Sequence, residues 1–191
     1  MRCHLCLNLS WQPLCKKCLH TILAPTPAFR ILESGLKVYS FYSYSDLAPL
    51  LHTKHTYIGA KIFAQLGAHT FFEFLKTFEL PRGICAIPID DHVRHGYSHS
   101  AILAKATKPF LTPIYGSLRA QNHESYSGKS RAYRQANKRE FIFTCKDEID
   151  AILIDDIVTT GSTLEEAHEI LKHHGVNVLF ALVLADAKEN S

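Results

Sequence analysis

Short apolar runs alternate along the chain with stretches in which apolar residues recur every three or four positions. The runs predict strands at residues 37–42, 84–89, 111–118, 141–143, 151–154 and 176–184. The periodic stretches predict helices at residues 57–78 (one helix, or two broken near Gly67), 97–107 and 164–174. Apolar strands that alternate with helices are typical of an α/β fold, with a mostly parallel sheet flanked by helices.

The chain of 191 residues suits one domain with a small appendage. Its formal net charge of +3 does not mark the whole protein as a nucleic-acid binder, so any basic surface must be local. No signal peptide is visible after Met1, and the longest apolar run, Val178 to Ala185, is far shorter than the roughly 20 residues of a membrane span. We therefore expect a cytoplasmic protein without a transmembrane segment, which reaches the inner face of a membrane through partners.

The first 18 residues contain four of the six cysteines, as two C-x2-C pairs separated by eight residues: Cys3, Cys6, Cys15 and Cys18. This spacing predicts a closed four-sulfur zinc site, which is structural because no coordination position stays open. The segment has almost no core of its own, so metal binding would supply its folding free energy. The alternatives are disulfides, which the reducing cytosol disfavours, and a redox C-x-x-C. We expect a zinc-binding module at residues 1–28 and a second domain at residues 29–191.

The strongest chemical signal follows the strand at residues 151–154. Two acids, Asp155 and Asp156, come directly after it, and a hydroxyl-rich turn at residues 159–163 precedes the next helix. Ligands bind at the carboxyl ends of parallel strands, and the N-terminus of a helix attracts an anion. The turn therefore predicts a phosphate site, whereas the acids suit the vicinal hydroxyls of a sugar or a Mg²⁺ ion held through water. The alternative is an ordinary helix with Ser162 or Thr163 at its N-cap.

Residues 152–163 resemble the phosphoribosyl-pyrophosphate motif of type I phosphoribosyltransferases. The resemblance implies that Asp155 and Asp156 contact the ribose hydroxyls and are the candidate catalytic residues. It also implies that the turn holds the 5-phosphate, through Thr159, Thr160, Gly161, Ser162 and Thr163. Mg²⁺ is the cofactor expected with this ligand, beside the structural zinc.

The whole chain resembles the ComF family of competence proteins, which have a domain similar to amidophosphoribosyltransferases and support DNA uptake in natural transformation. The resemblance runs nearly end to end, and it includes the cysteine pairs, Pro88, residues 94–98, Leu103-Ala104, Arg119, Gln121 and residues 131–137. The family usually has Arg-Gly-Phe-Asn-Gln where this chain has residues 95–99, and Lys54-His55 stands in for a Lys-Tyr pair. The resemblance implies a function in competence, with proteins of the DNA-uptake machinery as further partners.

Two further segments are candidate binding sites. The loop after the strand at residues 84–89 would receive the pyrophosphate, through Arg94, His95 and Gly96. Residues 119–139 have six basic residues against one acid, which suits single-stranded DNA through phosphate contacts and base stacking. The candidate DNA contacts are Arg119, Tyr126, Lys129, Arg131, Tyr133, Arg134, Lys138 and Arg139. In phosphoribosyltransferases a mobile loop in this second region closes over the ligand, and a solvated surface loop is the alternative for both segments.

Three functions are compatible with the sequence. The first is a competence protein that binds phosphoribosyl pyrophosphate and single-stranded DNA. The second is an active phosphoribosyltransferase, although the acceptor half of its site is not identifiable. The third is a scaffold that docks on the DNA-uptake machinery. The first is favoured because the resemblance covers the whole chain.

Overall fold

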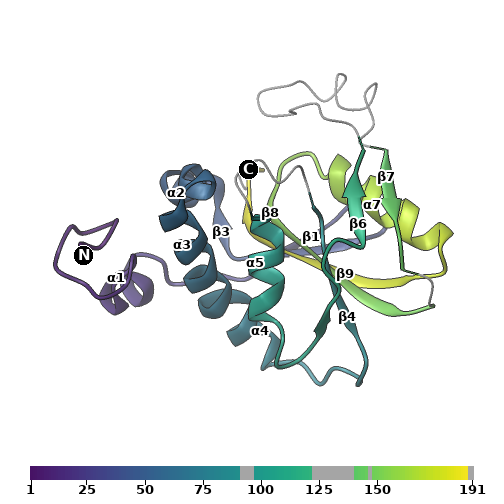
Figure 1. The fold of residues 1–191 in the computed structure, drawn as a ribbon, viewed down its shortest axis with the longest axis horizontal. Helices are drawn as coiled ribbons and strands as arrows, with labels where there is room; N and C mark the ends of the chain where they lie inside the picture. The colour runs from purple at the N-terminus through teal and green to yellow at the C-terminus, as the bar shows by residue number, and fades with distance from the viewer. Residues whose placement is uncertain (91–96, 122–139, 146–147, 189–191) are drawn as a thin grey trace.

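A computed structural model describes residues 1–90, 97–121, 140–145 and 148–188 of the protein (Figure 1). Its main strands are β1 (Ala28–Ile31), β2 (Lys37–Ser40), β3 (Tyr42–Ser43), β4 (Cys85–Pro88), β5 (Thr112–Pro113), β8 (Asp150–Val158) and β9 (Asn177–Asp186). They form a seven-stranded sheet of order β1-β2-β9-β8-β4-β5, in which β3 also pairs with β9. Among these described strands only β1 and β2 pair antiparallel. The predicted α/β fold with a mostly parallel sheet is therefore confirmed.

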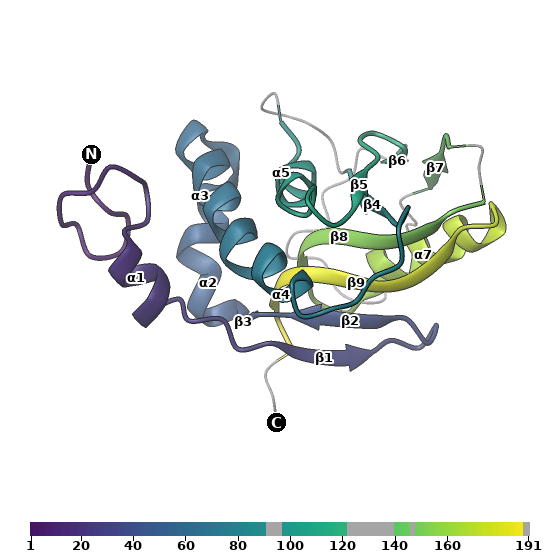
Figure 2. The same ribbon diagram turned by 90° about the horizontal axis from the view of Figure 1, so that it is seen from below.

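Helices cover both faces of this sheet (Figure 2). The helix α7 (Ser162–His173) lies on one face, and the other face carries α2 (Tyr44–Leu51), α3 (Tyr57–Gly67) and α5 (His99–Ala106). Shorter helical segments are the 3-10 turn η1 (His52–His55), the π-helical turn η2 (Ala68–Phe72) and α4 (Glu73–Leu75). Every helix in the described ranges is too short or too polar to span a bilayer.

The alternation of side chains along β8 separates two hydrophobic cores. Ala151 and Leu153 pack in the core that also contains the apolar face of α7. Ile152 and Ile154 pack in the core that contains the apolar faces of α2, α3 and α5. All four side chains are fully buried. Burial on both faces explains why the sequence shows a continuous apolar run here, since an alternating pattern arises only where one face is exposed.

The predicted helix at residues 57–78 is one continuous helical run from Tyr57 to Leu75, and Gly67 does not break it. The hydrogen bonding changes from α to π type at η2, immediately after this glycine. A Cβ at Gly67 would lie 3.1 Å from the Cβ of Ala106 and 3.3 Å from Cδ2 of Leu103. The glycine therefore allows α3 to pack closely against α5.

The sequence pattern does not predict α2 or β1. The helix α2 contains Pro49, and it begins where the hydroxyl of Ser43 accepts a hydrogen bond from the N–H of Asp46 at 3.2 Å. The strand β1 lies at the edge of the sheet with Phe29 and Ile31 exposed, so it lacks the continuous buried apolar run of the central strands.

The predicted extended segment at residues 111–118 forms only the two-residue strand β5 before a turn. Gly116 has a φ of 66° in that turn, a conformation that favours glycine. Leu118 then begins β6 (Leu118–Ala120), which pairs antiparallel with β7 (Phe141–Phe143) in a separate two-stranded sheet. This small sheet stands beside α7 (Figure 1).

The N-terminal cysteine segment, which includes the short helix α1 (Lys16–Thr21), packs against α3 (Figure 1). Leu14, Leu19 and Leu23 are buried in the same core as α3. The amide of Gln65 on α3 accepts from the N–H of Leu14 at 3.0 Å and donates to the carbonyl of Leu14 at 2.9 Å. Hydrogen bonds to both the N–H and the carbonyl of the buried Leu14 therefore hold the segment against α3.

Candidate functional site

The two acids of the predicted ligand site lie within β8, which does not end at Ile154 as the sequence predicts. The strand continues to Val158 because its pairing with β9 continues, with Asp155 opposite Val183. On its other side, β8 pairs with β4 only as far as Ile154. Asp155 and Asp156 therefore lie where β8 has left β4 but still pairs with β9, at the carboxyl ends of the parallel strands.

The turn at residues 159–163 gives α7 a glycine cap. Gly161 is the N-cap residue with a φ of 92°, and the helix begins at Ser162. This positive φ favours glycine, and a Cβ at Gly161 would also lie 2.7 Å from Cδ2 of Leu32, whose side chain would have to shift. The N–H of Ser162 donates a long hydrogen bond of 3.4 Å to Oγ1 of Thr160.

Neither Ser162 nor Thr163 is the N-cap residue, because both residues lie inside α7. Gly161 has no side chain to satisfy the N–H groups of the first turn. The first N–H groups of a helix have no partner within the helix itself, and together with the positive end of the helix dipole they make this end of α7 suitable for a phosphate.

Arg30 on β1 supports the turn, a role that the sequence analysis missed. Its Nη2 donates to the carbonyl of Thr159 at 2.5 Å, and its Nε lies 3.1 Å from Oδ2 of Asp186. The side chain of Arg30 is 19% exposed, so solvent screens its charge only in part. Arg30 thereby fixes the first residue of the turn to the end of β9, while Asp186 compensates its charge.

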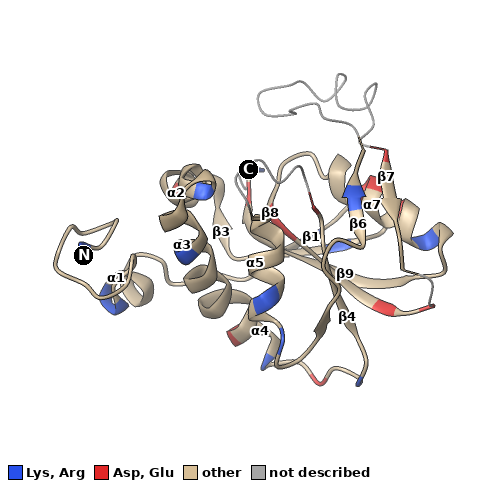
Figure 3. Ribbon diagram, viewed as in Figure 1, with Lys and Arg blue, Asp and Glu red and all other residues tan. Residues whose placement is uncertain are grey.

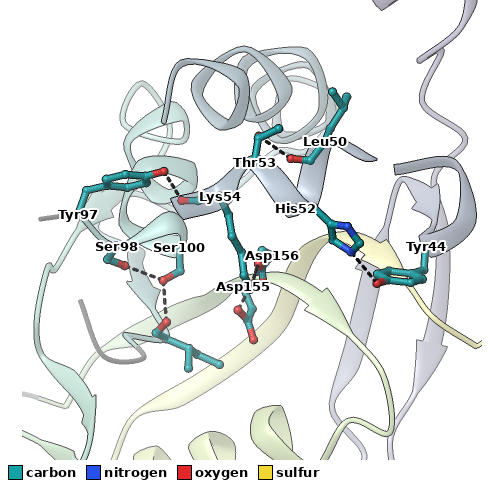
Figure 4. Close-up of polar contacts among 11 residues, drawn as sticks. Tyr44, Leu50, His52, Thr53, Lys54, Tyr97, Ser98, Ser100, Asp155 and Asp156 are labelled. Atoms are coloured by element: carbon teal, nitrogen blue, oxygen red, sulfur yellow. Dashed lines mark hydrogen bonds and ion pairs between the residues drawn. The ribbon is translucent and has the colours of Figure 1, made fainter. Parts of the chain in front are cut away.

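Lys54 on η1 contacts Asp156 of the acid pair, a contact that the sequence analysis did not predict (Figure 4). Its Nζ lies 3.2 Å from Oδ2 of Asp156, whose side chain is 11% exposed. The neighbouring carboxylate of Asp155 accepts a hydrogen bond from the backbone N–H of Asp156 at 2.8 Å. Sequence patterns alone could not place Lys54 beside the acids, because 102 positions separate it from Asp156.

The loop predicted to receive pyrophosphate contains residues 94–96, which lie outside the described residues, so their role stays a prediction. The residues on either side of this loop form a polar cluster. The carboxylate of Asp90 accepts from the hydroxyl of Ser98 and from the N–H of Gly116, the latter at 3.1 Å. Burial raises the pKa of Asp90, although these hydrogen bonds and the nearby charge of Arg119 oppose the shift. The cluster thus holds the two ends of the loop together.

Of the candidate DNA contacts, only Arg119 lies in the described part of the chain; the others fall within residues 122–139. Arg119 is exposed on β6, and its Nη2 would lie 2.4 Å from a Cβ at Gly116, so its guanidinium covers that glycine. The Lys and Arg residues that Figure 3 draws are scattered over several elements and do not form one basic face in this view. DNA binding by residues 119–139 stays a prediction.

The cysteine sulfurs form a second candidate site, whose geometry fits zinc. The Sγ atoms of Cys3, Cys6, Cys15 and Cys18 all lie within 4.8 Å of one another, and those of Cys6 and Cys15 are 3.8 Å apart. Zinc–sulfur bonds of about 2.3 Å place sulfurs about 3.8 Å apart around a tetrahedral ion. All four cysteines are free thiols. The arrangement therefore supports the metal site and not the disulfide alternative.

The environment of the cluster affects its thiols unequally. Burial opposes ionisation of Cys3, but hydrogen bonds from the backbone N–H groups of Cys6, Cys15 and Leu5 outweigh it and lower its pKa to about 6. Burial and the neighbouring thiols raise the pKa of Cys18 to about 12. Four thiolates this close repel one another, so the fully ionised cluster requires a bound cation.

Comparisons with solved structures find phosphoribosyltransferases. The chain is similar to orotate phosphoribosyltransferase from Aeropyrum pernix, with 21% identity, 91% of this chain and 82% of that chain covered, and a TM-score of 0.41. It is also similar to an adenine phosphoribosyltransferase, with 10% identity, 85% of each chain covered and a TM-score of 0.43. Adenine phosphoribosyltransferase from Leishmania tarentolae matches at 11% identity over 83% of this chain and 94% of that chain, with a TM-score of 0.41. No protein-family model and no curated protein matches the chain.

We expect the purified protein to contain about one zinc ion per chain and to lose it when Cys6 is changed to Ser. Because the cysteine segment shares a core with α3, the loss should lower the free energy of unfolding by more than about 2 kcal/mol. Elemental analysis and chemical denaturation measure the two effects. Cys145→Ser, which lies outside the cluster, is the matched control, and an unchanged zinc content in Cys6→Ser would contradict the assignment.

The buried carboxyl of Asp90 should make the stability depend on pH. Its pKa in the folded state is raised above the ordinary value of 3.8, so the folded state binds the proton more tightly than the unfolded state does. The stabilisation is therefore complete below about pH 4 and is lost as the pH rises through the folded pKa. As the pH is raised from about 4 to about 7, we expect the free energy of unfolding of the parent to fall relative to that of Asp90→Asn. Chemical denaturation of both proteins at each pH measures this difference. A difference that stays constant with pH would refute this.

Proposed function

We propose that the protein binds 5-phosphoribosyl 1-pyrophosphate at the carboxyl end of β8. The observation that carries the proposal is the sequence of groups along one short segment: two acids in the strand, then a glycine-capped helix N-terminus. A phosphate alone would need only the second feature. Because the acids Asp155 and Asp156 would repel a phosphate, they fit a neighbouring part of the ligand that carries hydroxyl groups.

In this proposal the ribose hydroxyls donate hydrogen bonds to Asp155 and Asp156. The 5-phosphate accepts hydrogen bonds from the first N–H groups of α7 and from the hydroxyls of Thr159, Thr160, Ser162 and Thr163. Gly161 gives the phosphate close access to the backbone. Arg30, which donates a hydrogen bond to the carbonyl of Thr159, keeps the turn in place.

The pyrophosphate would be received by residues 94–96, with Mg²⁺ as the cation that neutralises its charge. Carboxylate, phosphate and water oxygens are the ligands that Mg²⁺ prefers, and it keeps several of its waters when bound. The acid pair therefore suits Mg²⁺ held through water as well as the ribose hydroxyls.

The binding site can be tested by calorimetric titration of phosphoribosyl pyrophosphate with Mg²⁺ into the zinc-loaded protein. We expect saturable binding in the parent and a loss of at least about 100-fold in affinity in the Asp155→Asn/Asp156→Asn variant, because both acceptors of the ribose hydroxyls become poorer ones. The change Asp150→Asn, at the opposite end of β8, is the control and should leave the affinity unchanged. Equal affinity in the parent and in a folded double variant would contradict the proposal.

The biological role that we propose is that of a competence protein, which handles single-stranded DNA during uptake. Two sequence features support it: the nearly end-to-end resemblance to the ComF family and the basic, tyrosine-containing residues 119–139. Positive charges that contact phosphates, with aromatic rings that stack on bases, are the chemistry of single-strand binding without sequence preference.

We expect a fluorescent single-stranded oligonucleotide to bind the parent, with an affinity that falls steeply as the salt concentration rises. The Arg131→Ala/Arg134→Ala variant should bind about tenfold more weakly and show a shallower salt dependence, since each removes a phosphate contact. Lys172→Ala, an exposed lysine on α7, serves as the control. Binding that ignores salt, or that the double variant retains in full, would refute the DNA role.

Two alternatives make different predictions. If the protein is an active phosphoribosyltransferase, pyrophosphate release should depend on an added acceptor. If it is a scaffold for the uptake machinery, it should remain folded and bind neither ligand. One observation favours a docking role as a second function: Leu7, Leu9 and Trp11 on the cysteine segment are exposed, Trp11 completely. An exposed apolar group of this kind is typical of a surface that meets a partner.

A further inference from the structure

The lysine of η1 forms an ion pair that differs in its exposure from the ion pair of Lys76 on the surface. Lys54 reaches Asp156 at 3.2 Å, and the two side chains are 35% and 11% exposed. Lys76 reaches Glu73 at 3.0 Å, but there the side chains are 48% and 55% exposed. Solvent screens the first pair much less, because its carboxylate is nearly buried.

The backbone of η1 is held in place by the elements around it. The hydroxyl of Tyr97 lies between the carbonyls of Lys54 and Thr56, at 2.9 Å from the latter (Figure 4). The hydroxyl of Thr56 caps α3 by accepting from the N–H of Gly59 at 3.0 Å. A Cβ at Gly59 would lie 1.9 Å from the carbonyl oxygen of Thr53, so the turn rests directly on the first turn of α3. Lys54 therefore extends toward β8 from a fixed backbone.

The charge of Lys54 addresses a difficulty in the proposed site. Two adjacent carboxylates next to a phosphorylated ligand repel it, and in a partly buried site water reduces this repulsion only in part. Arg30 lies on the phosphate side of the turn, as described above. Lys54 lies on the side of the acids, where it offsets the charge of Asp156 and fixes one of its oxygens.

We infer that Lys54 is a positioning residue for the ribose end of the ligand. It holds the carboxylate of Asp156 in one orientation, so that this carboxylate accepts a hydrogen bond from a ribose hydroxyl, and it lowers the repulsion between the acids and the phosphates. Tyr97 holds the turn that carries Lys54 and thereby ties it to the N-terminal end of α5. This inference deepens the proposed function and rests on it.

The test compares phosphoribosyl-pyrophosphate affinity, with Mg²⁺, in the parent, Lys54→Met, Lys54→Arg and Lys76→Met. We expect about a tenfold loss in Lys54→Met, because a nearly buried carboxylate loses its charged partner. Lys54→Arg should bind within about threefold of the parent, since guanidinium also pairs with carboxylate. Lys76→Met removes the matched, exposed ion pair and should leave the affinity unchanged. Thermal unfolding of each variant shows whether the fold is intact.

A double-mutant cycle separates positioning from a general structural effect. If Lys54 acts through Asp156, then Lys54→Met should cost nothing further in an Asp156→Asn background. If the fold-losses in affinity of the two single variants multiply in the double variant, the inference is wrong. It is also wrong if Lys54→Met binds the ligand as tightly as the parent.

The failure of this inference can be distinguished from failure of the proposed function. If the parent binds the ligand and the Asp155→Asn/Asp156→Asn variant does not, while Lys54→Met binds normally, only the role of Lys54 is wrong. If the parent binds neither phosphoribosyl pyrophosphate nor ribose 5-phosphate, the ligand site and the role of Lys54 are both overturned.

Discussion

The unequal pairing of β8 on its two sides is the constraint on which the rest of the site depends. The strand pairs with β9 as far as Val158, but with β4 only as far as Ile154. Because the pairing with β9 continues, the acids lie on a hydrogen-bonded strand. The edge of β8 that faces β4 is no longer paired with β4 beyond Ile154. A strand that ended at Ile154 would place the same acids on a loop, where their geometry would be less well defined.

The site is assembled from both halves of the chain. The second half supplies the groups proposed to bind the ligand, namely the acids and the turn before α7. The first half supplies two cations, Arg30 from β1 and Lys54 from η1, and each contacts one of these two groups. In the proposed site an acid pair and a phosphate lie side by side and repel each other, and the charge of Lys54 offsets part of this repulsion.

Much of the fold could be predicted from the sequence. The strands β4, β8 and β9 are buried on both faces, so their continuous apolar runs were informative, and the spacing of the cysteines indicated a cluster that the structure brings together. The edge strand β1 escaped prediction because it is short and exposed, and α2 escaped because Pro49 lies within its short apolar pattern.

Within the site, the acids and the turn could be found from their order along the chain, because they are local. Arg30, Lys54 and Asp90 could not, because their contacts depend on the tertiary structure. Arg30 meets Thr159 across 129 positions, and the surroundings of Asp90 come from two separate segments. The end of β8 was also misplaced, since strand length here is set by the partner strand and not by the hydrophobicity of residues 155–158.

The position of α3 has a consequence for how the protein responds as a whole. Its N-terminal end begins at the turn that carries Lys54, and further along it Gln65 grips the backbone of Leu14 in the cysteine segment. The helix α3 therefore contacts both the cysteine segment and the turn beside the acids. If the proposed ligand binds at the turn of Lys54 and displaces α3, it would also affect the cysteine segment, and any such coupling would act equally in both directions.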